Sequence, residues 1–412
     1  MVQRAANAAV AWLVASRHKP GMNPLYAQMG TTIFEAMSVR ARETGAINLG
    51  QGFADGRGPE AVLQAAARAL LEKSNQYPPM AGLPELRQAV ADHYVRHQGI
   101  DLAPEEVIVT SGATEALAAA LFALIEPGDE VLLFQPLYDA YVPLVRQAGG
   151  VPRFVRLKPP HWRIDAATLE AAITPRTRLL VLNNPLNPAA TMCSAEELAT
   201  LAAFCVAHDL IAVCDEVWEH VTFDGARHLP LIGFPGMRER TVKIGSAGKI
   251  FALTGFKVGW LCAAPPLARV LARAHQFLTF TTPPNLQWAV AEGLATQDAW
   301  VQEASHRFQQ GRDRLAAGLA ASGLAVLPSA ATYFLSVDLI ASGITLDDRQ
   351  FCERLIEAGV VAIPVSAFYA EDPVTHVVRF CFVKEDATLD AAITRIAAAR
   401  HAWSIAGTGS SS

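Results

Sequence analysis

Lys249 is the residue of this chain whose surroundings most clearly suit covalent chemistry. A short apolar strand beginning at Thr241 runs into the small-residue turn Gly245-Ser246-Ala247-Gly248, and the lysine follows that turn directly. Turns favour Gly and Ser, but nothing in turn chemistry requires an amine at this point. A lysine amine in a partly desolvated pocket has a lowered pKa and can form a Schiff base with a carbonyl group. The alternative is a solvated turn lysine. A phosphate-binding P-loop is excluded, because its pattern fails at Lys243 and Ile250.

A second group of residues could bind an anion. The predicted strand ending at Thr110 runs into Ser111 to Leu117, a small-residue turn that opens an Ala/Leu helix. The free N–H groups and the dipole of a helix N-terminus attract anions. Ser246 and Lys257 add a hydroxyl and a cation, so that together these groups suit a phosphate dianion. Ser and Thr also cap helices for purely structural reasons, and that alternative stays open.

Three further residues follow predicted strands. Asp215 comes directly after an apolar run, and a buried carboxylate there needs a partner, either a cation such as a protonated pyridine nitrogen or another side chain of the chain. Tyr138 can stack on a flat heterocycle, although an ordinary packed tyrosine also fits the sequence. Asn187 lies in a turn whose two prolines fix the backbone, so that its amide can point inward.

Arg379 lies inside the apolar strand predicted at Val377 to Phe382. A guanidinium is kept in such a strand only if a planar anion satisfies it, and a carboxylate that accepts two hydrogen bonds is the best match. The carboxylate of a substrate would serve, and an internal Asp or Glu would serve as well.

The elements that must position these residues form an α/β pattern. Helices are predicted at 59–73 and 84–98, and from about residue 105 to 265 short continuous apolar runs alternate with helical segments. Such runs are typical of strands buried on both faces of a largely parallel sheet, in which ligands bind beyond the carboxyl ends of the strands. The predicted strands cover residues 106–110, 130–134, 178–182, 210–214 and 241–244.

The pattern changes after about residue 296. A long helix through Leu319, strands at 324–327, 333–337 and 377–382 and a helix at 347–358 predict a second, smaller α+β domain. Near the N-terminus a helix through Ala15 and a helical pattern from Thr31 to Gly45 are predicted. We expect an N-terminal arm with part of the small domain at 1–58, a large domain at 59–295, the rest of the small domain at 296–406 and a flexible tail at 407–412.

Composition excludes several classes of protein. The chain has 412 residues, of which 51% are hydrophobic and 18% charged, and a net charge of −5, which favours a large buried core and argues against nucleic acid as a partner. No apolar run reaches the roughly 18 to 20 residues of a membrane helix, and the run Ala8 to Ala15 is short for an export signal. The six cysteines lack the paired spacings of zinc or redox motifs, so we expect a reduced, cytoplasmic compartment and no metal site.

From about residue 25 to 400 the chain resembles the fold-type I pyridoxal-phosphate aminotransferases of classes I and II. The closest likeness is to the branch of kynurenine, glutamine and methionine aminotransferases, through NLGQGFAD, NQYPPMAG, SAGKIFALTGFKVGW and RFCFVKEDATL. The resemblance implies the α/β fold of that family, a large domain with a mostly parallel sheet between helices plus a smaller α+β domain. The matching segments are Asn48 to Asp55, Asn75 to Tyr77, Ser111 to Leu117, Tyr138, Asn183 to Pro188, Asp215 to Val217, Ser246 to Lys249 and Arg379 to Val383.

The resemblance also implies the role of each residue. Lys249 would bond covalently to pyridoxal 5′-phosphate and then move a proton, while Asp215 would pair with the pyridine nitrogen. Arg379 would bind the α-carboxylate of the substrate, which Gly52 and Asn187 would also contact. The other contacts to the cofactor would come from Gly112, Ala113, Thr114, Ser246 and Lys257 around the phosphate, from Tyr138, Asn187 and Trp218 around the ring, and from Tyr77 of the second subunit of a homodimer whose active sites lie at the subunit interface.

Trp218 departs from the family pattern. The family usually has a tyrosine three residues after the aspartate, and its phenol bonds the cofactor's 3′-oxygen. An indole N–H can donate a hydrogen bond but cannot accept one or ionise. We therefore predict a donor-only bond from Trp218, which favours the ionised form of that oxygen.

The sequence thus predicts an aminotransferase that moves an amino group from a neutral amino acid (methionine, glutamine, aromatic or kynurenine-like) to a 2-oxo acid. The preference for neutral donors follows from the branch, since no second arginine is identifiable as a clamp for a side-chain carboxylate. The alternative is β-elimination from cysteine S-conjugates, which passes through the same carbanion. An arm of about 25 residues argues against an N-terminal DNA-binding domain. The joint presence of Lys249, Asp215 and Arg379 argues against a homologue without catalytic activity.

Overall fold

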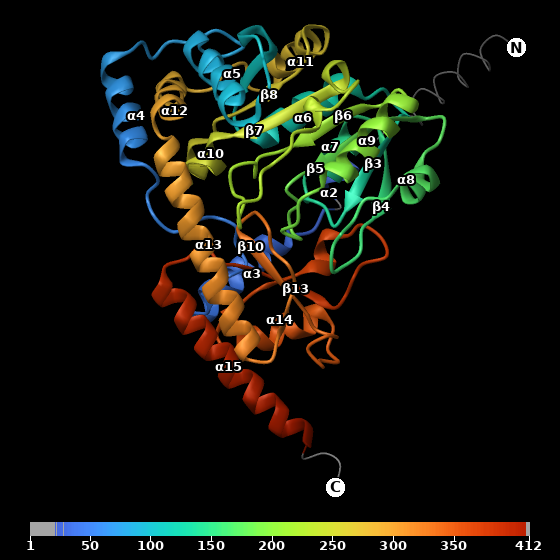
Figure 1. Ribbon diagram of the computed structural model, residues 1–412, viewed down its shortest axis with the longest axis vertical. Coiled ribbons are helices and arrows are strands. Elements are labelled where there is room, and N and C mark those ends of the chain that lie inside the picture. Colours follow the sequence, from blue (N-terminus) through green and yellow to red (C-terminus); the bar gives the residue numbers. More distant parts are fainter. Residues whose placement is uncertain (1–20, 22, 28, 409–412) are drawn as a thin grey trace, which may run out of the picture. The chain divides into compact units, whose positions relative to one another are not determined.

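The computed structural model describes residues 21, 23–27 and 29–408, and the chain divides into two compact units, residues 1–32 and 33–412. The described residues of the first unit contain the short helix α2 (Pro24–Ala27). The second unit contains three β-sheets with their helices (Figure 1). The helix predicted through Ala15 and the apolar run Ala8 to Ala15 lie outside the described residues.

A seven-stranded sheet with the order β2-β8-β7-β6-β5-β3-β4 forms the larger part of the second unit. All neighbouring strands are parallel except β8, which is antiparallel to both β2 and β7. Every residue of β2, β3 and β7 is buried, as their continuous apolar runs predicted. The strands are β2 (Val107–Thr110), β3 (Glu130–Gln135), β4 (Val151–Arg156), β5 (Thr177–Asn183), β6 (Ile211–Asp215), β7 (Thr241–Ser246) and β8 (Gly259–Cys262).

Two of these strands, β4 and β8, were not predicted. β4 is at the edge of the sheet, and most of its side chains are at least partly exposed, so it lacks the apolar run of a central strand. β8 spans only four residues and directly follows the turn that contains Lys257. Its pairing with β2 and β7 is a long-range contact that local sequence does not reveal.

Helices cover the seven-stranded sheet and connect its strands. α6 begins directly after β2, so its N-terminus lies at the carboxyl end of that strand, where the sequence predicted an anion site. The helices of this region are α4 (Glu60–Glu72), α5 (Pro84–Gln98), α6 (Ala113–Leu124), α7 (Tyr141–Gln147), α8 (Ala166–Ala172), α9 (Ala195–Ala207), α10 (Ala247–Ile250), α11 (Pro265–Leu278) and α12 (Pro284–Thr296), with 3₁₀ turns at Pro104–Glu106, Leu231–Gly233, Arg238–Arg240 and Thr254–Phe256.

A smaller α+β region carries a four-stranded antiparallel sheet with the order β12-β13-β10-β9 and a parallel pair, β1 with β11. The long helix α13, orange in Figure 1, packs along the C-terminal helix α15, shown in red. The strands are β1 (Ile47–Asn48), β9 (Ala325–Val326), β10 (Phe334–Asp338), β11 (Val360–Val361), β12 (Ile363–Pro364) and β13 (Val377–Cys381), and the helices are α3 (Ile33–Thr44), α13 (Asp298–Ala321), α14 (Asp348–Glu357) and α15 (Asp386–Thr408), with a 3₁₀ turn at Val365–Phe368.

The predicted α/β fold class, with a mostly parallel large sheet and a smaller α+β region, is confirmed. Helix α15 was not predicted, and it extends through Thr408, into the segment expected to be a tail; residues 409–412 lie outside the described part. The residue bounds given above for the domains stay a prediction. Among the described helices, none is both long and apolar enough to cross a membrane.

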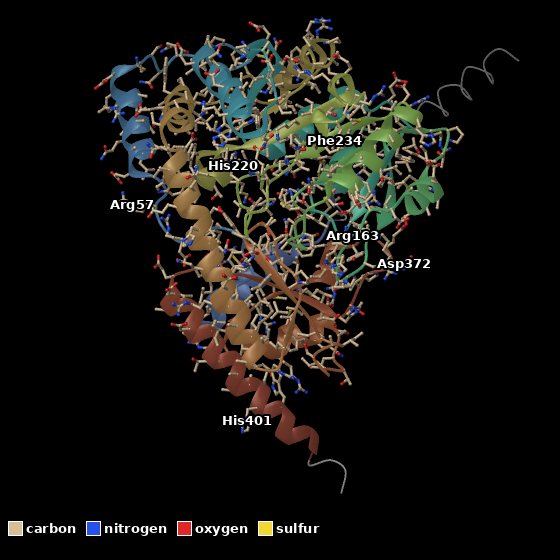
Figure 2. The ribbon with its side chains drawn as sticks, viewed as in Figure 1. Arg57, Arg163, His220, Phe234, Asp372 and His401 are labelled. Carbon is tan, nitrogen blue, oxygen red and sulfur yellow. The ribbon has the colours of Figure 1, made fainter. Side chains whose placement is uncertain are left out.

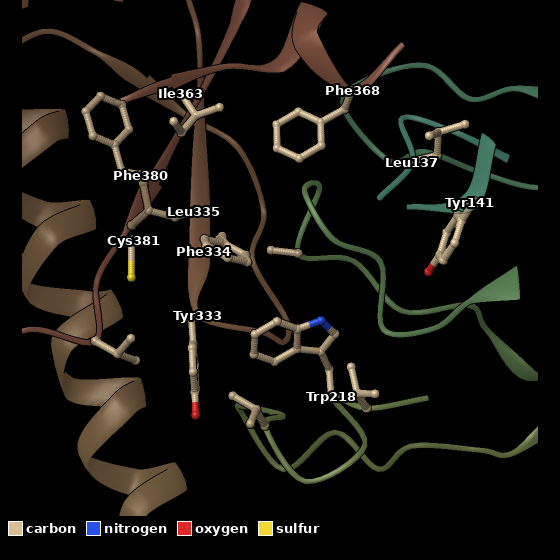
Figure 3. Packing of buried hydrophobic residues seen from close by; sticks show 14 of the residues in the cluster. Leu137, Tyr141, Trp218, Tyr333, Phe334, Leu335, Ile363, Phe368, Phe380 and Cys381 are labelled. Atoms are coloured by element: carbon tan, nitrogen blue, oxygen red, sulfur yellow. The ribbon is translucent and has the colours of Figure 1, made fainter. Parts of the chain in front are cut away.

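One hydrophobic cluster joins the two regions at the place where the functional residues meet. Trp218, from the loop after β6, packs edge-to-face on Tyr333 and Phe334, which enter β10 (Figure 3). Each fully buried aromatic side chain contributes about 1.5–3 kcal/mol, and edge-to-face pairs add about 0.5–1.5 kcal/mol more. The cluster therefore fixes the carboxyl ends of the large sheet relative to β10 and β13.

Candidate active site

A pocket of about 220 Å³ lies at the carboxyl ends of β5, β6 and β7 and at the N-terminus of α6. Every residue predicted to contact the cofactor lines this pocket, with the exception of Tyr77. The complete lining is Gly112, Ala113, Thr114, Leu117, Tyr138, Asn183, Asn187, Asp215, Val217, Trp218, Ser246, Gly248, Lys249, Thr254, Lys257 and Val258.

Lys249 lies on α10, directly after β7, and its amine points into the pocket. Its Nζ lies 4.3 Å from the centre of the Trp218 ring and 3.5 Å from the carbonyl oxygen of Gly52. Burial lowers the pKa of Lys249 to about 8, although the negative charge of Asp215 opposes the shift. At pH 7 about a tenth of the amine is then neutral, far more than for an ordinary lysine. The amine is thus available as a nucleophile and as a proton acceptor, and it is not a solvated turn lysine.

Gly52 brings its carbonyl group close to this amine because it has no side chain. A Cβ atom at this position would lie 2.4 Å from Cζ of Phe334, which is too close for any other residue without movement of the ring. Position 52 therefore accepts glycine without movement of the Phe334 ring, which agrees with its predicted place beside the site.

Asp215, at the end of β6, is only 5% exposed. Its carboxylate accepts a 2.6 Å hydrogen bond from the phenol of Tyr141. Burial raises the pKa of Asp215, and the bond from Tyr141 counteracts part of that rise. In the described part of the chain no Lys, Arg or His nitrogen lies within 4.0 Å of this carboxylate, so the alternative of an internal ion pair is not realised. A buried carboxylate without a cation can be satisfied by a cationic ligand.

The N-terminus of α6 forms the other end of the pocket. Gly112 caps the helix with φ 83°, a backbone conformation that favours glycine, and Ala113 and Thr114 form the first turn. The Nζ of Lys257 lies near this turn, since a Cβ atom on Gly112 would come within 3.2 Å of it. One end of the pocket is therefore surrounded by the N–H groups of α6, the ammonium group of Lys257 and the hydroxyl of Ser246. These groups suit a dianion.

Arg379, on β13, is 1% exposed. Its Nη2 donates a 2.6 Å hydrogen bond to the carbonyl of Gly50, and its Nη1 donates a 2.9 Å bond to Oδ1 of Asn187. Its Cζ lies 3.8 Å from the centre of the Phe334 ring, and its buried Nε has no hydrogen-bond partner within the described part of the chain. Among the described residues no Asp or Glu oxygen comes within 4.0 Å of it. Burial lowers the pKa of Arg379 to about 9. The internal Asp or Glu considered above is therefore not found among the described residues, and the guanidinium is left for another carboxylate.

Asn187 connects this arginine to the pocket. Its backbone N–H donates a 2.8 Å bond to Oδ1 of Asn183, while its own Oδ1 accepts from Arg379. The amide nitrogen of Asn187 then remains as a donor for a ligand, because the oxygen is already engaged. Asn183 in turn donates from its amide to the backbone oxygen of Asp215, so the ends of β5 and β6 are held together.

Trp218 was expected at the active site of its own chain, and Tyr77 at that of the second subunit. The structure places Trp218 in the pocket and Tyr77 outside it. Trp218 is 3% exposed and lines the pocket, with its six-membered ring toward Tyr333 and its nitrogen on the opposite side (Figure 3). Its bond to a cofactor oxygen stays a prediction. Tyr77 is 82% exposed, lies outside the pocket of its own chain and packs edge-to-face on Phe280.

Sequence reasoning missed several residues that hold the site in place. Tyr141 follows Tyr138 by three residues, yet only the fold shows that its phenol meets Asp215. Gly50 lies within a segment that the sequence singled out, but its carbonyl bond to Arg379 carries no sequence signal. Phe334 looks like an ordinary strand residue.

Comparisons with known proteins agree with this geometry. Residues 44–396 match the family model described as aminotransferase class I and II. A Mycobacterium tuberculosis protein named probable N-succinyldiaminopimelate aminotransferase is 48% identical over 89% of this chain and 95% of its own length. The methionine aminotransferase of Escherichia coli is 41% identical over 90% of this chain and 96% of its own, and human kynurenine–oxoglutarate transaminase 1 is 36% identical over 85% and 92%.

A solved structure shows the same fold. The structure of N-succinyldiaminopimelate aminotransferase from M. tuberculosis superimposes with a TM-score of 0.88, at 48% identity, over 92% of this chain and all of the other.

The donor set of the pocket fits pyridoxal 5′-phosphate, the cofactor on which the family depends. Lys249 offers an amine for the aldehyde, Asp215 an unpaired carboxylate for the ring nitrogen, and the N-terminus of α6 with Lys257 an anion site for the phosphate. The chain belongs to the class I and II aminotransferases and is a pyridoxal-phosphate-dependent enzyme.

Proposed function

We propose that this aminotransferase takes the amino group from a neutral L-amino acid and passes it to a 2-oxo acid. The observation that carries the proposal is the environment of Arg379. Its buried guanidinium has no acidic partner in the part of the chain that the structure describes, and the rings of Phe34, Phe334 and Phe368 surround it. The guanidinium suits the α-carboxylate that amino and oxo acids share. The aromatic rings suit an uncharged side chain, and no arginine lines the pocket itself in the described residues.

Each residue of the pocket has one task in this proposal. The bound cofactor would supply an aldehyde and an electron-withdrawing ring. Lys249 would take up and return the proton of the substrate Cα at its Nζ, a task that needs a lysine pKa near neutrality. Asp215 would keep the ring nitrogen charged, and Tyr138 would stack on the ring. The cluster around Trp218 would exclude water.

We further propose a homodimer in which Tyr77 completes the active site of the partner. Tyr77 is 82% exposed and Phe277 is 86% exposed, and Leu278 and Phe280 are also exposed nearby in sequence. Exposed aromatic groups of this kind mark protein–protein interfaces. Phe277→Asp, which leaves the pocket untouched, should shift the sedimentation coefficient toward that of a monomer. A cytoplasmic location is also proposed, because all six cysteines are free.

A second candidate donor has a remote carboxylate. The relative named as an N-succinyldiaminopimelate aminotransferase, at 48% identity, favours it over the relatives named for methionine and kynurenine. β-Elimination from cysteine S-conjugates is the third outcome, because it uses the same residues.

A substrate panel distinguishes these candidates. The purified yellow holoprotein is mixed with methionine, glutamine, phenylalanine, kynurenine, N-succinyldiaminopimelate and a cysteine S-conjugate, and loss of the visible absorption band is followed. The recovery of the band with different 2-oxo acids then identifies the acceptor. A kcat/KM at least tenfold higher for a neutral donor supports the proposal. A preference for N-succinyldiaminopimelate, or release of a thiol with pyruvate as the main reaction, contradicts it.

The covalent assignment has a separate test. Borohydride reduction of the holoprotein, followed by mass spectrometry of its peptides, should show the cofactor attached to Lys249. Attachment to any other lysine would contradict the role given to this residue.

A further inference from the structure

A cluster of three histidines and one aspartate lies outside the active-site pocket and has no role in the proposed reaction. His93 and His97 are one turn apart on α5, His220 comes from the loop after β6, and Asp298 is the first residue of α13. His220 is labelled in Figure 2, beside the upper part of α13. Segments far apart in the sequence, such as those of His97 and Asp298 at a separation of 201 residues, thus bring together four side chains of types that commonly bind metals.

We propose that this cluster binds one divalent transition-metal ion, with Zn²⁺ as the best match. One ligand atom from each of His93, His97 and Asp298 can be chosen so that all three lie within 4.8 Å of one another. The ring of His220 lies 4.7 Å from that of His93 and 5.2 Å from that of His97, so it borders this group of three, and the proposal includes its movement toward the ion as the fourth ligand. Three imidazoles and one carboxylate form a donor set that suits Zn²⁺, with bonds of about 2.0–2.2 Å in a tetrahedral arrangement.

The hydrogen bonds within the cluster leave at least one histidine ring nitrogen unused. Nε2 of His93 lies 2.7 Å from Nε2 of His220, and Nε2 of His97 lies 3.1 Å from Oδ1 of Asp298. His93 is only 2% exposed, and its Nδ1 is buried without a hydrogen-bond partner among the described residues. A buried ring nitrogen without a partner is costly, and binding of an ion between the rings would allow the imidazoles to rearrange and use these nitrogens.

Neighbouring charged groups also contact residues that could bind such an ion. Nε of Arg96 lies 3.6 Å from Oδ2 of Asp298 and holds the second carboxylate oxygen, which leaves Oδ1 for the ion. A second group of potential ligands, Glu216, Glu219 and His228, is already neutralised by the ammonium group of Lys243 and does not need an ion.

Bound at this position, the ion would connect α5, the loop that carries Trp218 and the start of α13. A ligand that binds only the folded state raises its stability. The proposal does not depend on the amino acid that the enzyme uses.

Calorimetric titration of the untagged holoprotein with ZnCl₂, after dialysis against a chelator, tests the proposal. We expect one equivalent per chain, a higher Tm with the ion, and a visible absorption of tetrahedral Co²⁺ when Co²⁺ replaces Zn²⁺. His97→Gln should weaken binding by tenfold or more and abolish the Co²⁺ band, as losses at metal sites generally exceed about tenfold. His208→Gln, which changes a histidine paired with Glu170 elsewhere, should bind like the native protein.

Asp298→Asn provides a second variant on the protein surface, should His97→Gln fail to fold, and the same weakening is expected. Absence of stoichiometric binding to the native protein would overturn the proposal. Binding that persists unchanged in His97→Gln or Asp298→Asn would also overturn it, because the ion would then lie elsewhere, for example at the cofactor phosphate.

Discussion

The phenol of Tyr141 donates a 2.6 Å hydrogen bond to the carboxylate of Asp215, and among the described residues it is the one side chain that donates a hydrogen bond to that carboxylate. Tyr141 is 2% exposed and begins α7, so its position is fixed by packing. The bond holds Asp215 toward the pocket and stabilises its ionised form, which burial alone would disfavour. Control of the charge on Asp215 is therefore shared between the end of β6 and the first residue of helix α7.

Tyr141→Phe should move the acidic limb of the kcat/KM profile to higher pH. Removing the donor raises the pKa of Asp215 further, so that the ionised form required for activity appears only at higher pH. Hydrogen bonds to charged groups contribute about 1.5–3 kcal/mol, which corresponds to a shift of about 1–2 pH units. Tyr369→Phe is the matched control, because that phenol donates to a backbone oxygen at Leu157, away from the pocket. An unchanged acidic limb in Tyr141→Phe would show that the bond does not tune Asp215.

The rate at which the apoprotein takes up pyridoxal phosphate should rise with pH and level off above about pH 8. Only the neutral amine of Lys249 reacts with an aldehyde, and burial lowers the pKa of this lysine to about 8. At an ordinary lysine pKa the rate would continue to rise by about tenfold per pH unit up to pH 10. Stopped-flow absorbance distinguishes the two curves, and Lys249→Arg should remain folded but show no covalent uptake at any pH.

Arg379→Lys should reduce kcat/KM for every amino acid and 2-oxo acid by a hundredfold or more, a loss on the order of 3 kcal/mol in transition-state binding. An ammonium group cannot reproduce the flat, two-point match of a guanidinium with a carboxylate. The cofactor content should stay unchanged, because Arg379 does not line the cofactor pocket.

Arg312→Lys is the control for this experiment. Arg312 is also an arginine buried in the protein, but it bonds to both carboxylate oxygens of Asp224. The substitution Arg312→Lys should lower the free energy of unfolding without changing KM. A KM that responds equally to both substitutions would contradict the assignment of Arg379 to the substrate.

The residues that the sequence singled out for catalysis and substrate binding are those whose type is anomalous in its local setting, and their roles stay predictions. Lys249 was identified as an amine after a glycine-rich turn, Asp215 as a carboxylate after an apolar strand, and Arg379 as a guanidinium inside an apolar strand. None of these identifications required knowledge of the residue's partners. The partners themselves were missed, because Tyr141 is 74 residues from Asp215, and Gly50 is 329 residues from Arg379. Such contacts depend on the sheet order and on the packing of the two regions.

The same distinction applies to the metal site proposed above. His93 and His97 have the spacing of two ligands on one helical face, a signal present in the sequence, but their convergence with His220 and Asp298 depends on the fold. In the fold itself, central strands were predicted from their apolar runs. The edge strand β4 was missed because most of its side chains are at least partly exposed, so that it has no continuous apolar run.

Trp218→Phe should raise the pH midpoint of the visible band of the holoprotein. The indole N–H is a donor, and a donor to the cofactor's 3′-oxygen favours its ionised form; without the donor a higher pH is needed for the same ionisation. Phenylalanine keeps an aromatic surface against Tyr333 and Phe334, so the packing of the cluster is largely retained. Spectrophotometric titration of the native protein, Trp218→Phe and Trp218→Tyr measures the midpoints, and three coincident curves would refute the bond.

Lys243→Met should destabilise the protein strongly, even though the residue does not line the pocket. Lys243, on β7, is fully buried and its ammonium group contacts the carboxylates of Glu216 and Glu219, the latter at 2.6 Å. The substitution removes the ammonium group and leaves the two buried carboxylates without their lysine partner. Breaking a buried ion pair in this way typically lowers the free energy of unfolding by about 3–5 kcal/mol. The urea midpoint and the Tm of the apoprotein should both fall, whereas Lys73→Met at an exposed lysine should change neither.

The pH dependence of stability provides an independent test of this network. Burial alone would raise the pKa of Glu216, but the charges of Lys243 and His228 outweigh it and lower that pKa to about 2. Because the folded pKa is below the unfolded value, Glu216 contributes stability that is present above about pH 4.5 and is lost as the pH falls toward 2. In Lys243→Met the pKa of Glu216 should rise, so acid should destabilise the variant less steeply over this range than it destabilises the native protein. Urea unfolding at a series of pH values measures the slopes, and parallel curves for the two proteins would show that Lys243 does not control the ionisation of Glu216.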